Sequence, residues 1–170
     1  MEGVNTIISE GETVATVSTP IIDNTKIRIA TYNSKGHGTD RIDYMKQLLY
    51  SNDVLFIQEH WYFESGITDF EAQLDGFSVL GISGIDESEV LLGRPYGGCA
   101  IIYNNRLKCS ILPVALDSRR CMACVVTING VKLLFINVYM PCDVNVNAFE
   151  VAYNDVLHDI ESCINYYADI

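Results

Sequence analysis

Three consecutive polar residues, Gln58, Glu59 and His60, follow an apolar run at residues 54–57. A carboxylate directly after a buried strand lies at the edge of a sheet, where its oxygens can hold a hard cation such as Mg²⁺. A glutamate in this position is more often a cap or the partner of a base, so Glu59 alone is a weak signal. Its value as a site residue depends on which other polar side chains share that edge.

Asn33 lies at the end of the predicted strand before Glu59. If the two strands are neighbours in the sheet, the Asn33 amide and the Glu59 carboxylate meet at one rim. An asparagine here is at least as often a turn residue that stabilises its own loop. Lys35, two residues further on, can offer charge to a phosphate, but it cannot bind a cation while it is protonated.

Tyr139 and Arg120 add two groups that suit a phosphate. Tyr139 follows the apolar run at 131–138. A tyrosine at a rim can donate to a phosphate oxygen, although most tyrosines after an apolar strand are core residues. Arg120, preceded by Arg119, leads directly into the next predicted strand, and a guanidinium gives a phosphate two parallel hydrogen bonds. The plain alternative for this pair is a solvated strand end.

The elements that position these residues begin with a strand, a helix and a strand. An alternating pattern predicts a first strand that ends near Asn33. Apolar positions every three to four residues predict a helix over about 40–51, capped by Thr39 or Asp40. A second, fully buried strand is expected at 54–58. This order is typical of a βαβ opening.

Further strands and two helices follow this opening. The helices are expected at about 67–75 and 147–167, the second with a capping pair of Asn147 and Glu150. Asn129-Gly130 predicts a tight hairpin, because both turn residues must take positive φ. The strands are expected at 77–82, 99–103, 109–115, 121–128 and 131–138. The fold class is therefore α/β, a mixed and largely antiparallel sheet with flanking helices.

The 170 residues and their 49% apolar content suit one domain with a sizeable core. Residues 1–25 are expected to form a loosely ordered leader, and residues 26–170 to form the domain. No run approaches the roughly 18 apolar residues of a spanning helix, and the start of the chain has no signal-peptide pattern. We expect no membrane association and an intracellular location, nuclear or cytoplasmic.

The formal charge of −11 argues against a polyanionic partner when it is taken alone. Residues 1–25 and 133–170 carry acids and no Lys or Arg, so all 11 bases lie between them. The acidity therefore belongs to the ends of the chain. Even in the middle, the bases form no block typical of a nucleic-acid patch.

The six cysteines include one C-x-x-C, at Cys121 and Cys124, inside an apolar stretch. A zinc site needs a second pair at similar spacing and turn residues nearby, and neither is present. We expect buried free thiols on a strand, in a reducing compartment.

Five segments with polar or glycine residues follow one another along the chain. They are Thr31-Tyr32-Asn33, Gln58-Glu59-His60-Trp61, Gly93-Arg94-Pro95-Tyr96-Gly97-Gly98-Cys99-Ala100-Ile101, Ser118-Arg119-Arg120-Cys121 and Asn137-Val138-Tyr139-Met140-Pro141. In this order they resemble the endonuclease/exonuclease/phosphatase superfamily, and within it the endonuclease domains of non-LTR retrotransposons, which are similar to apurinic/apyrimidinic endonucleases. The resemblance covers about residues 26–167.

The resemblance implies phosphodiester hydrolysis with Mg²⁺ (or Mn²⁺) and an activated water, with DNA as the partner of the complete domain. Glu59 matches the metal-binding glutamate. Asn33 matches the asparagine that helps to hold the site and the phosphate, and Tyr139 the tyrosine that contacts the scissile phosphate. Arg120 matches an arginine before a strand in the retroelement group, a candidate phosphate-binding residue.

The resemblance also implies parts that these 170 residues do not contain. Lys35 stands where many members have Asp or Asn. A Gly-Asp-x-Asn motif and a terminal Asp-His pair should follow the 147–167 helix, and neither occurs. We therefore expect the N-terminal half of a four-layer α/β sandwich with weak or no activity. Its apolar sheet face would be exposed, which favours self-association.

Two alternatives remain open. One keeps the superfamily but replaces DNA by a phosphoinositide or another small phosphoester. The other is a non-catalytic interaction module that kept the sheet and lost the site. In that case Glu59→Ala should change no measurable property, including Mg²⁺ binding.

Overall fold

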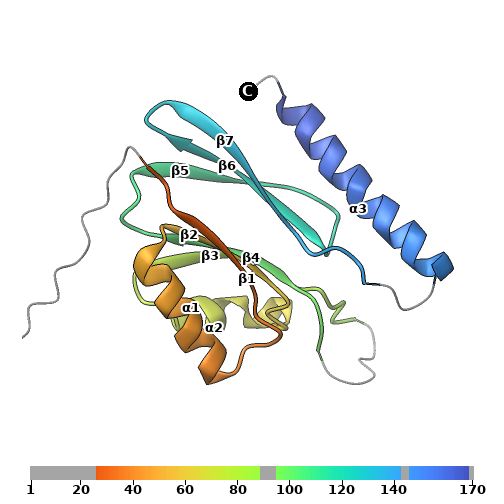
Figure 1. The fold of residues 1–170 in the computed structure, drawn as a ribbon, viewed down its shortest axis with the longest axis horizontal. Coiled ribbons are helices and arrows are strands. Elements are labelled where there is room, and N and C mark those ends of the chain that lie inside the picture. The colour runs from red at the N-terminus through yellow and green to blue at the C-terminus, as the bar shows by residue number, and fades with distance from the viewer. Residues whose placement is uncertain (1–25, 89–94, 143–145, 169–170) are drawn as a thin grey trace, which may run out of the picture.

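Two β-sheets lie face to face, and helices cover both outer faces, which gives four layers (Figure 1). The computed structural model describes residues 26–88, 95–142 and 146–168. The predicted leader at 1–25 lies outside the described residues. Among the described helices, none is both long and apolar enough to cross a membrane.

The first sheet has the strand order β1-β2-β4-β3. Its strands are β1 (Ile29–Asn33), β2 (Val54–Gln58), β3 (Phe77–Ile82) and β4 (Cys99–Asn104). Helix α1 (Thr39–Ser51) connects β1 to β2, which pair in parallel, and this confirms the predicted βαβ opening. The other pairs are antiparallel. The short helices η1 (Glu64–Gly66) and α2 (Ile67–Ala72) precede β3.

The second sheet is antiparallel, with the order β5-β6-β7. Its strands are β5 (Cys109–Val114), β6 (Cys121–Ile128) and β7 (Val131–Val138), and α3 (Val146–Tyr167) follows them. Asn129 and Gly130 join β6 to β7 with φ of 51° and 80°, so the predicted hairpin is confirmed.

Apolar side chains fill the spaces between the layers. Ile42, Met45 and Leu49 of α1 pack on Leu55 and Ile57 of β2 in one buried cluster. A second cluster lies between the sheets, where the Phe56 and Phe135 rings approach to 5.6 Å between centroids. On the outer side of the second sheet, Val156 and Cys163 of α3 are buried. The mixed α/β fold class is therefore confirmed.

The helix ends differ from the prediction. Gly38 is the N-cap of α1 and no side chain caps it, so Thr39 and Asp40 lie in the first turn instead. Helix α2 ends at Ala72, earlier than expected. Helix α3 begins at Val146, which places Asn147 inside the helix. Local sequence specifies the existence of a helix better than its last residue.

The cysteines of the C-x-x-C lie buried on β6, as predicted. Successive side chains of a strand point to opposite faces, so residues three apart face opposite ways. Cys124 accordingly belongs to the cluster between the sheets, and Cys121 does not. These two thiols cannot ligate one ion together.

The expected exposed sheet face is not found among the described residues, because the two sheets cover each other's inner faces. Exposed apolar side chains lie instead on the inward side of β1 and β7, one edge strand of each sheet. Ile29 on β1 is 47% exposed, and Val131 and Leu133 on β7 are 58% and 36% exposed. β7 contacts β2 and β4, while β5 faces β3 across a small pocket. The β1 edge of the first sheet and the β7 edge of the second therefore lie on the same side of the sandwich. These three residues form what we call the open strip.

We predict that the chain self-associates through the open strip, because exposed apolar strand edges pair with other chains. Light scattering after size-exclusion chromatography should show mass that rises with concentration. Leu133→Lys should reduce this mass. Leu112→Lys, a matched change on β5 outside the strip at a residue 63% exposed, should not. A monomer at all concentrations with one cooperative melting transition would contradict the prediction.

Candidate functional site

Asn33 and Glu59 meet at the edge where the parallel strands β1 and β2 end. Asn33 is aligned with Gln58, one residue before Glu59. The Asn33 Nδ2 donates a hydrogen bond of 2.7 Å to Glu59 Oε1. The Asn33 Oδ1 accepts from the backbone N–H of Lys35 at 3.2 Å. Asn33 therefore stabilises its own turn and also orients the carboxylate.

Tyr139 reaches the same carboxylate from the other sheet, where it follows β7. Its hydroxyl lies close enough to the Glu59 carboxylate for the two groups to interact electrostatically. Burial, and then the neighbouring Glu59 charge, raise the pKa of Tyr139 above its ordinary value. The tyrosine hydroxyl therefore keeps its proton and stays a donor near neutral pH.

Arg120 lies beside Tyr139. The Tyr139 backbone N–H donates to the Arg120 carbonyl at 2.8 Å, and the guanidinium carbon is 5.4 Å from the centre of the tyrosine ring. Arg119 turns elsewhere and binds the Ile85 carbonyl and the Asp86 carboxylate, both at 3.0 Å. The four residues predicted from the sequence thus lie at one edge, while Arg119 anchors a loop. The Gly93-Arg94 part of the third segment lies outside the described residues.

The backbone at Glu59 is held in the left-handed region, with φ of 56°. A residue other than glycine adopts this conformation at a cost and keeps it only where its surroundings enforce it. The Glu59 N–H donates to the Gly98 carbonyl at 2.9 Å. The Glu59 carbonyl accepts from the Gly36 N–H at 2.8 Å and from the Ser34 hydroxyl at 3.1 Å. Two neighbouring loops therefore set the direction of the Glu59 side chain.

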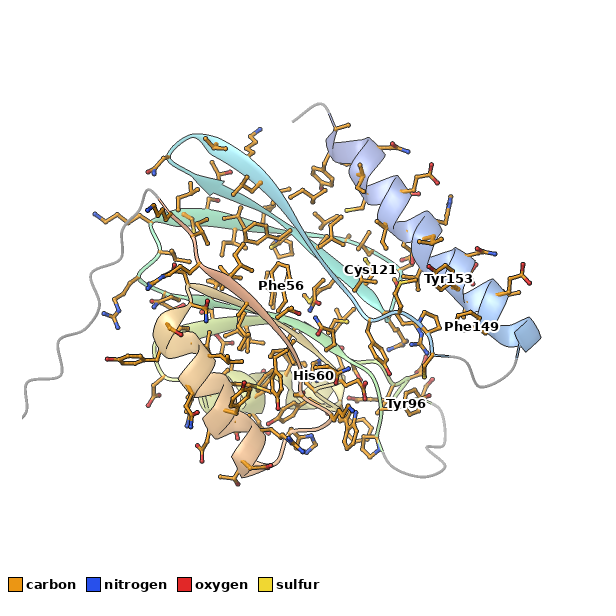
Figure 2. All side chains as sticks on the ribbon, viewed as in Figure 1. Phe56, His60, Tyr96, Cys121, Phe149 and Tyr153 are labelled. Atoms are coloured by element: carbon orange, nitrogen blue, oxygen red, sulfur yellow. The ribbon has the colours of Figure 1, made fainter. Side chains whose placement is uncertain are left out.

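His60 is buried behind this edge rather than exposed in it (Figure 2). Its Nδ1 accepts from the Tyr62 N–H at 3.0 Å, so its Nε2 carries the proton and donates to the Ile82 carbonyl at 3.1 Å. Burial lowers the pKa of His60 from 6.5 to about 4. The neutral imidazole is a support for the loop and is no metal ligand, since both nitrogens are occupied.

We predict that the protein loses stability as the pH falls from about 6.5 to 4. The folded His60 pKa lies below the unfolded one, so the unfolded chain binds this proton first. Over this pH range the free energy of unfolding falls by about 3 kcal/mol in total. Urea unfolding across this pH range measures it. His60→Asn removes the titrating group and should flatten the dependence of the unfolding free energy on pH. His158→Asn, a change at an exposed histidine of α3, is the control and should leave that dependence as it is. The same pH dependence in all three proteins would contradict the prediction.

Gln58 and Asn137, which the sequence did not single out as site residues, lie beneath the edge. Asn137 on β7 is 1% exposed, and its Oδ1 accepts from Gln58 Nε2 at 2.6 Å. The sequence signal for Asn137 is an amide two residues after Phe135 in an apolar strand, which puts the two side chains on the same face. Buried amides of this kind need partners, which sequence alone does not identify.

The donor set at the edge fits a hydrated Mg²⁺ better than a zinc ion. Mg²⁺ keeps several waters and commonly takes one or two carboxylates together with substrate phosphate. Glu59 supplies one such carboxylate. Among the described residues, no group of three or more His, Cys, Asp or Glu could hold a metal on its own. Glu59 would hold the ion, with Asn33 and Tyr139 orienting its carboxylate.

Comparison with solved structures identifies the fold. AP endonuclease LMAP from Leishmania major matches 84% of this chain and 49% of its own, with 14% identity and a TM-score of 0.63. An endonuclease/exonuclease/phosphatase family protein from Bacteroides thetaiotaomicron matches 85% of this chain and 58% of its own, with 17% identity and a TM-score of 0.53. The chain has the endonuclease/exonuclease/phosphatase fold.

This endonuclease/exonuclease/phosphatase fold also includes the endonuclease domain of TRAS1, a telomere-specific non-LTR retrotransposon. It matches 76% of this chain and 53% of its own, with 11% identity and a TM-score of 0.52. The chain spans about half the length of the solved structures that it matches. No family model and no curated protein sequence matches it.

Proposed function

We propose that the edge formed by Asn33, Glu59, Tyr139 and Arg120 binds Mg²⁺ (or Mn²⁺) and a DNA phosphodiester, as part of an endonuclease site of the retroelement type. The observation that carries this proposal is the Glu59 carboxylate, which accepts a hydrogen bond from Asn33 of one sheet and interacts electrostatically with the Tyr139 hydroxyl, which follows the other sheet. A carboxylate that is oriented by one donor and faces a second polar group at a sheet edge is organised for a ligand rather than for the core. The guanidinium beside it supplies the charge that a phosphate requires.

Each residue has a distinct task in this proposal. A bound Mg²⁺ would neutralise charge on the phosphate and its leaving oxygen. Glu59 binds the ion, and Asn33 keeps the carboxylate turned toward it. Tyr139 and Arg120 bind phosphate oxygens, the first through its hydroxyl and the second through its guanidinium.

The four residues include no group that could remove a proton from water, apart from the carboxylate assigned to the metal. His60 is excluded because both of its nitrogens are occupied. We therefore propose that these 170 residues bind metal and DNA but cleave DNA slowly or not at all. Robust Mg²⁺-dependent nicking of supercoiled plasmid by the purified chain would contradict this part of the proposal.

We predict that Arg120→Ala weakens Mg²⁺-dependent binding of duplex DNA by about 10-fold, because one charge-assisted contact to phosphate is lost. Fluorescence anisotropy of a labelled duplex measures this affinity. Lys46→Ala, an exposed base on α1, serves as the matched control and should have little effect. Equal effects of the two changes would contradict the role of Arg120.

The same titration separates DNA from a small phosphoester. The resemblance to retrotransposon endonucleases and the fold shared with AP endonucleases support DNA. Unlabelled duplex should displace the labelled DNA at lower concentration than an inositol phosphate does. The reverse order would favour the phosphoinositide alternative. If the chain binds neither the duplex nor the inositol phosphate, and Glu59→Ala changes no measured property, the result would favour the interaction module.

A further inference from the structure

Asn137 occupies an unusual place for an amide. It lies on the inward face of β7, between the two sheets, and is 1% exposed. Its neighbour on the same face, Phe135, is also buried and packs against Phe56 of the opposite sheet. A leucine or valine would fill this position without needing partners, so the amide requires an explanation.

The polar atoms of Asn137 bind two strands of the opposite sheet. Its Nδ2 donates to the Ile57 carbonyl of β2 and to the Ala100 carbonyl of β4, both at 2.8 Å. Its Oδ1 accepts from Gln58 Nε2 at 2.6 Å. These partners define the orientation of the amide, because carbonyl oxygens can only accept. One side chain thus fastens β7 across β2 and β4.

Gln58 extends this connection to β1. Its Nε2 also donates to the Thr31 hydroxyl at 3.1 Å. Glu59 follows Gln58 directly, Asn33 follows Thr31 by two residues, and Tyr139 follows Asn137 by two. The network of Thr31, Gln58 and Asn137 therefore lies immediately beneath the three residues that meet at the edge.

We propose that Asn137 is a positioning residue that sets the spacing between Glu59 and Tyr139, and with it the affinity of the edge for a divalent cation. Glu59 and Tyr139 belong to different sheets, and apolar packing between sheets does not define their offset as closely as directed hydrogen bonds do. The Asn137 amide takes part in three such bonds, one of them with Gln58, the residue directly before Glu59. This inference rests on the proposed function, because it assigns a role toward the metal held there.

The experiment uses Mn²⁺ as the probe and the full 170-residue chain, with free Mn²⁺ measured by electron paramagnetic resonance. Asn137→Leu keeps the approximate volume and removes the hydrogen bonds. It should weaken Mn²⁺ binding by about 10-fold, the lower end for residues that orient a ligand. Phe135→Leu, a buried change on the same strand face, should stay within about twofold of the wild type. Each variant is measured well below its own melting temperature.

A second comparison distinguishes positioning from general stability. Tyr139→Phe alone should weaken Mn²⁺ binding by about 10-fold. In the Asn137→Leu background it should weaken binding no further, since the hydroxyl no longer meets the carboxylate. If Asn137→Leu does not fold, Gln58→Met tests the same network from β2 and should give the same two results.

The outcomes separate this inference from the proposed function. If Asn137→Leu or Gln58→Met binds Mn²⁺ as Phe135→Leu does, or if Tyr139→Phe keeps its full effect in their background, Asn137 is no positioning residue although the metal site stands. If the wild type takes up no Mn²⁺, or if Glu59→Gln binds it unchanged, both the proposed function and this inference are overturned.

Discussion

Replacing Glu59 by glutamine is expected to weaken Mn²⁺ binding by at least about 100-fold. Loss of a group that only orients a ligand costs 10- to 100-fold, and Glu59 is the ligand itself. The glutamine keeps the size of the side chain and can still accept from Asn33 Nδ2, as Glu59 does at 2.7 Å. The change therefore removes the charge while leaving the shape of the edge.

Glu161→Gln is the matched control for this measurement. Glu161 is an exposed residue of α3 and carries the same charge. If both variants change the Mn²⁺ affinity equally, the effect arises from net charge and the proposed site is wrong. A second readout is the melting temperature, which Mn²⁺ should raise in the wild type and in Glu161→Gln but not in Glu59→Gln.

Replacing Gly98 by alanine is expected to destabilise the fold by about 3–5 kcal/mol, a drop of roughly 10 °C or more in melting temperature. An added Cβ would lie 2.5 Å from His60 Cε1 and 2.6 Å from Nε2. The imidazole cannot move aside, because it is buried and bonded through both nitrogens. Gly98 also has φ of 88°, which disfavours any L side chain.

Gly76→Ala separates these two contributions. Gly76 has a similar φ of 82°, and an added Cβ would meet nothing within 4 Å. It should therefore lose only about 1 kcal/mol, the backbone part of the effect. In a His60→Ala background, Gly98→Ala should cost about the same small amount. Equal losses for Gly98→Ala and Gly76→Ala in the wild type would show that His60 does not restrict this loop.

The sequence predicts that Asn33 and Glu59 lie at one sheet edge, because the ends of the strands can be recognised from local residue patterns. Asn33 and Glu59 both follow β-strand patterns, and the helix between those strands makes them parallel neighbours, so the order of the elements is enough to bring the two side chains together. The positions of the strands and the hairpin at Asn129-Gly130 follow from the same local patterns. Helix caps are predicted less well, because the path of the incoming loop makes Gly38 the cap in place of Thr39 or Asp40.

The support beneath the edge does not follow from local patterns. His60 is neutral because Gly98, distant in sequence, allows its ring to be enclosed, and because Tyr62 and Ile82 occupy its nitrogens. Asn137 finds its partners on two strands of the other sheet. Both arrangements depend on long-range pairing, which residue type and spacing do not contain.

A crystal of the chain soaked in Mn²⁺, with the ion located by its anomalous scattering, shows directly whether this edge binds a metal. We expect one peak about 2 Å from a Glu59 carboxylate oxygen, on the side of the carboxylate that faces away from Asn33 and Tyr139. The peak should be absent from Glu59→Gln crystals soaked in the same way. A peak elsewhere, or none in the wild type, would contradict the assignment of this edge as a metal site.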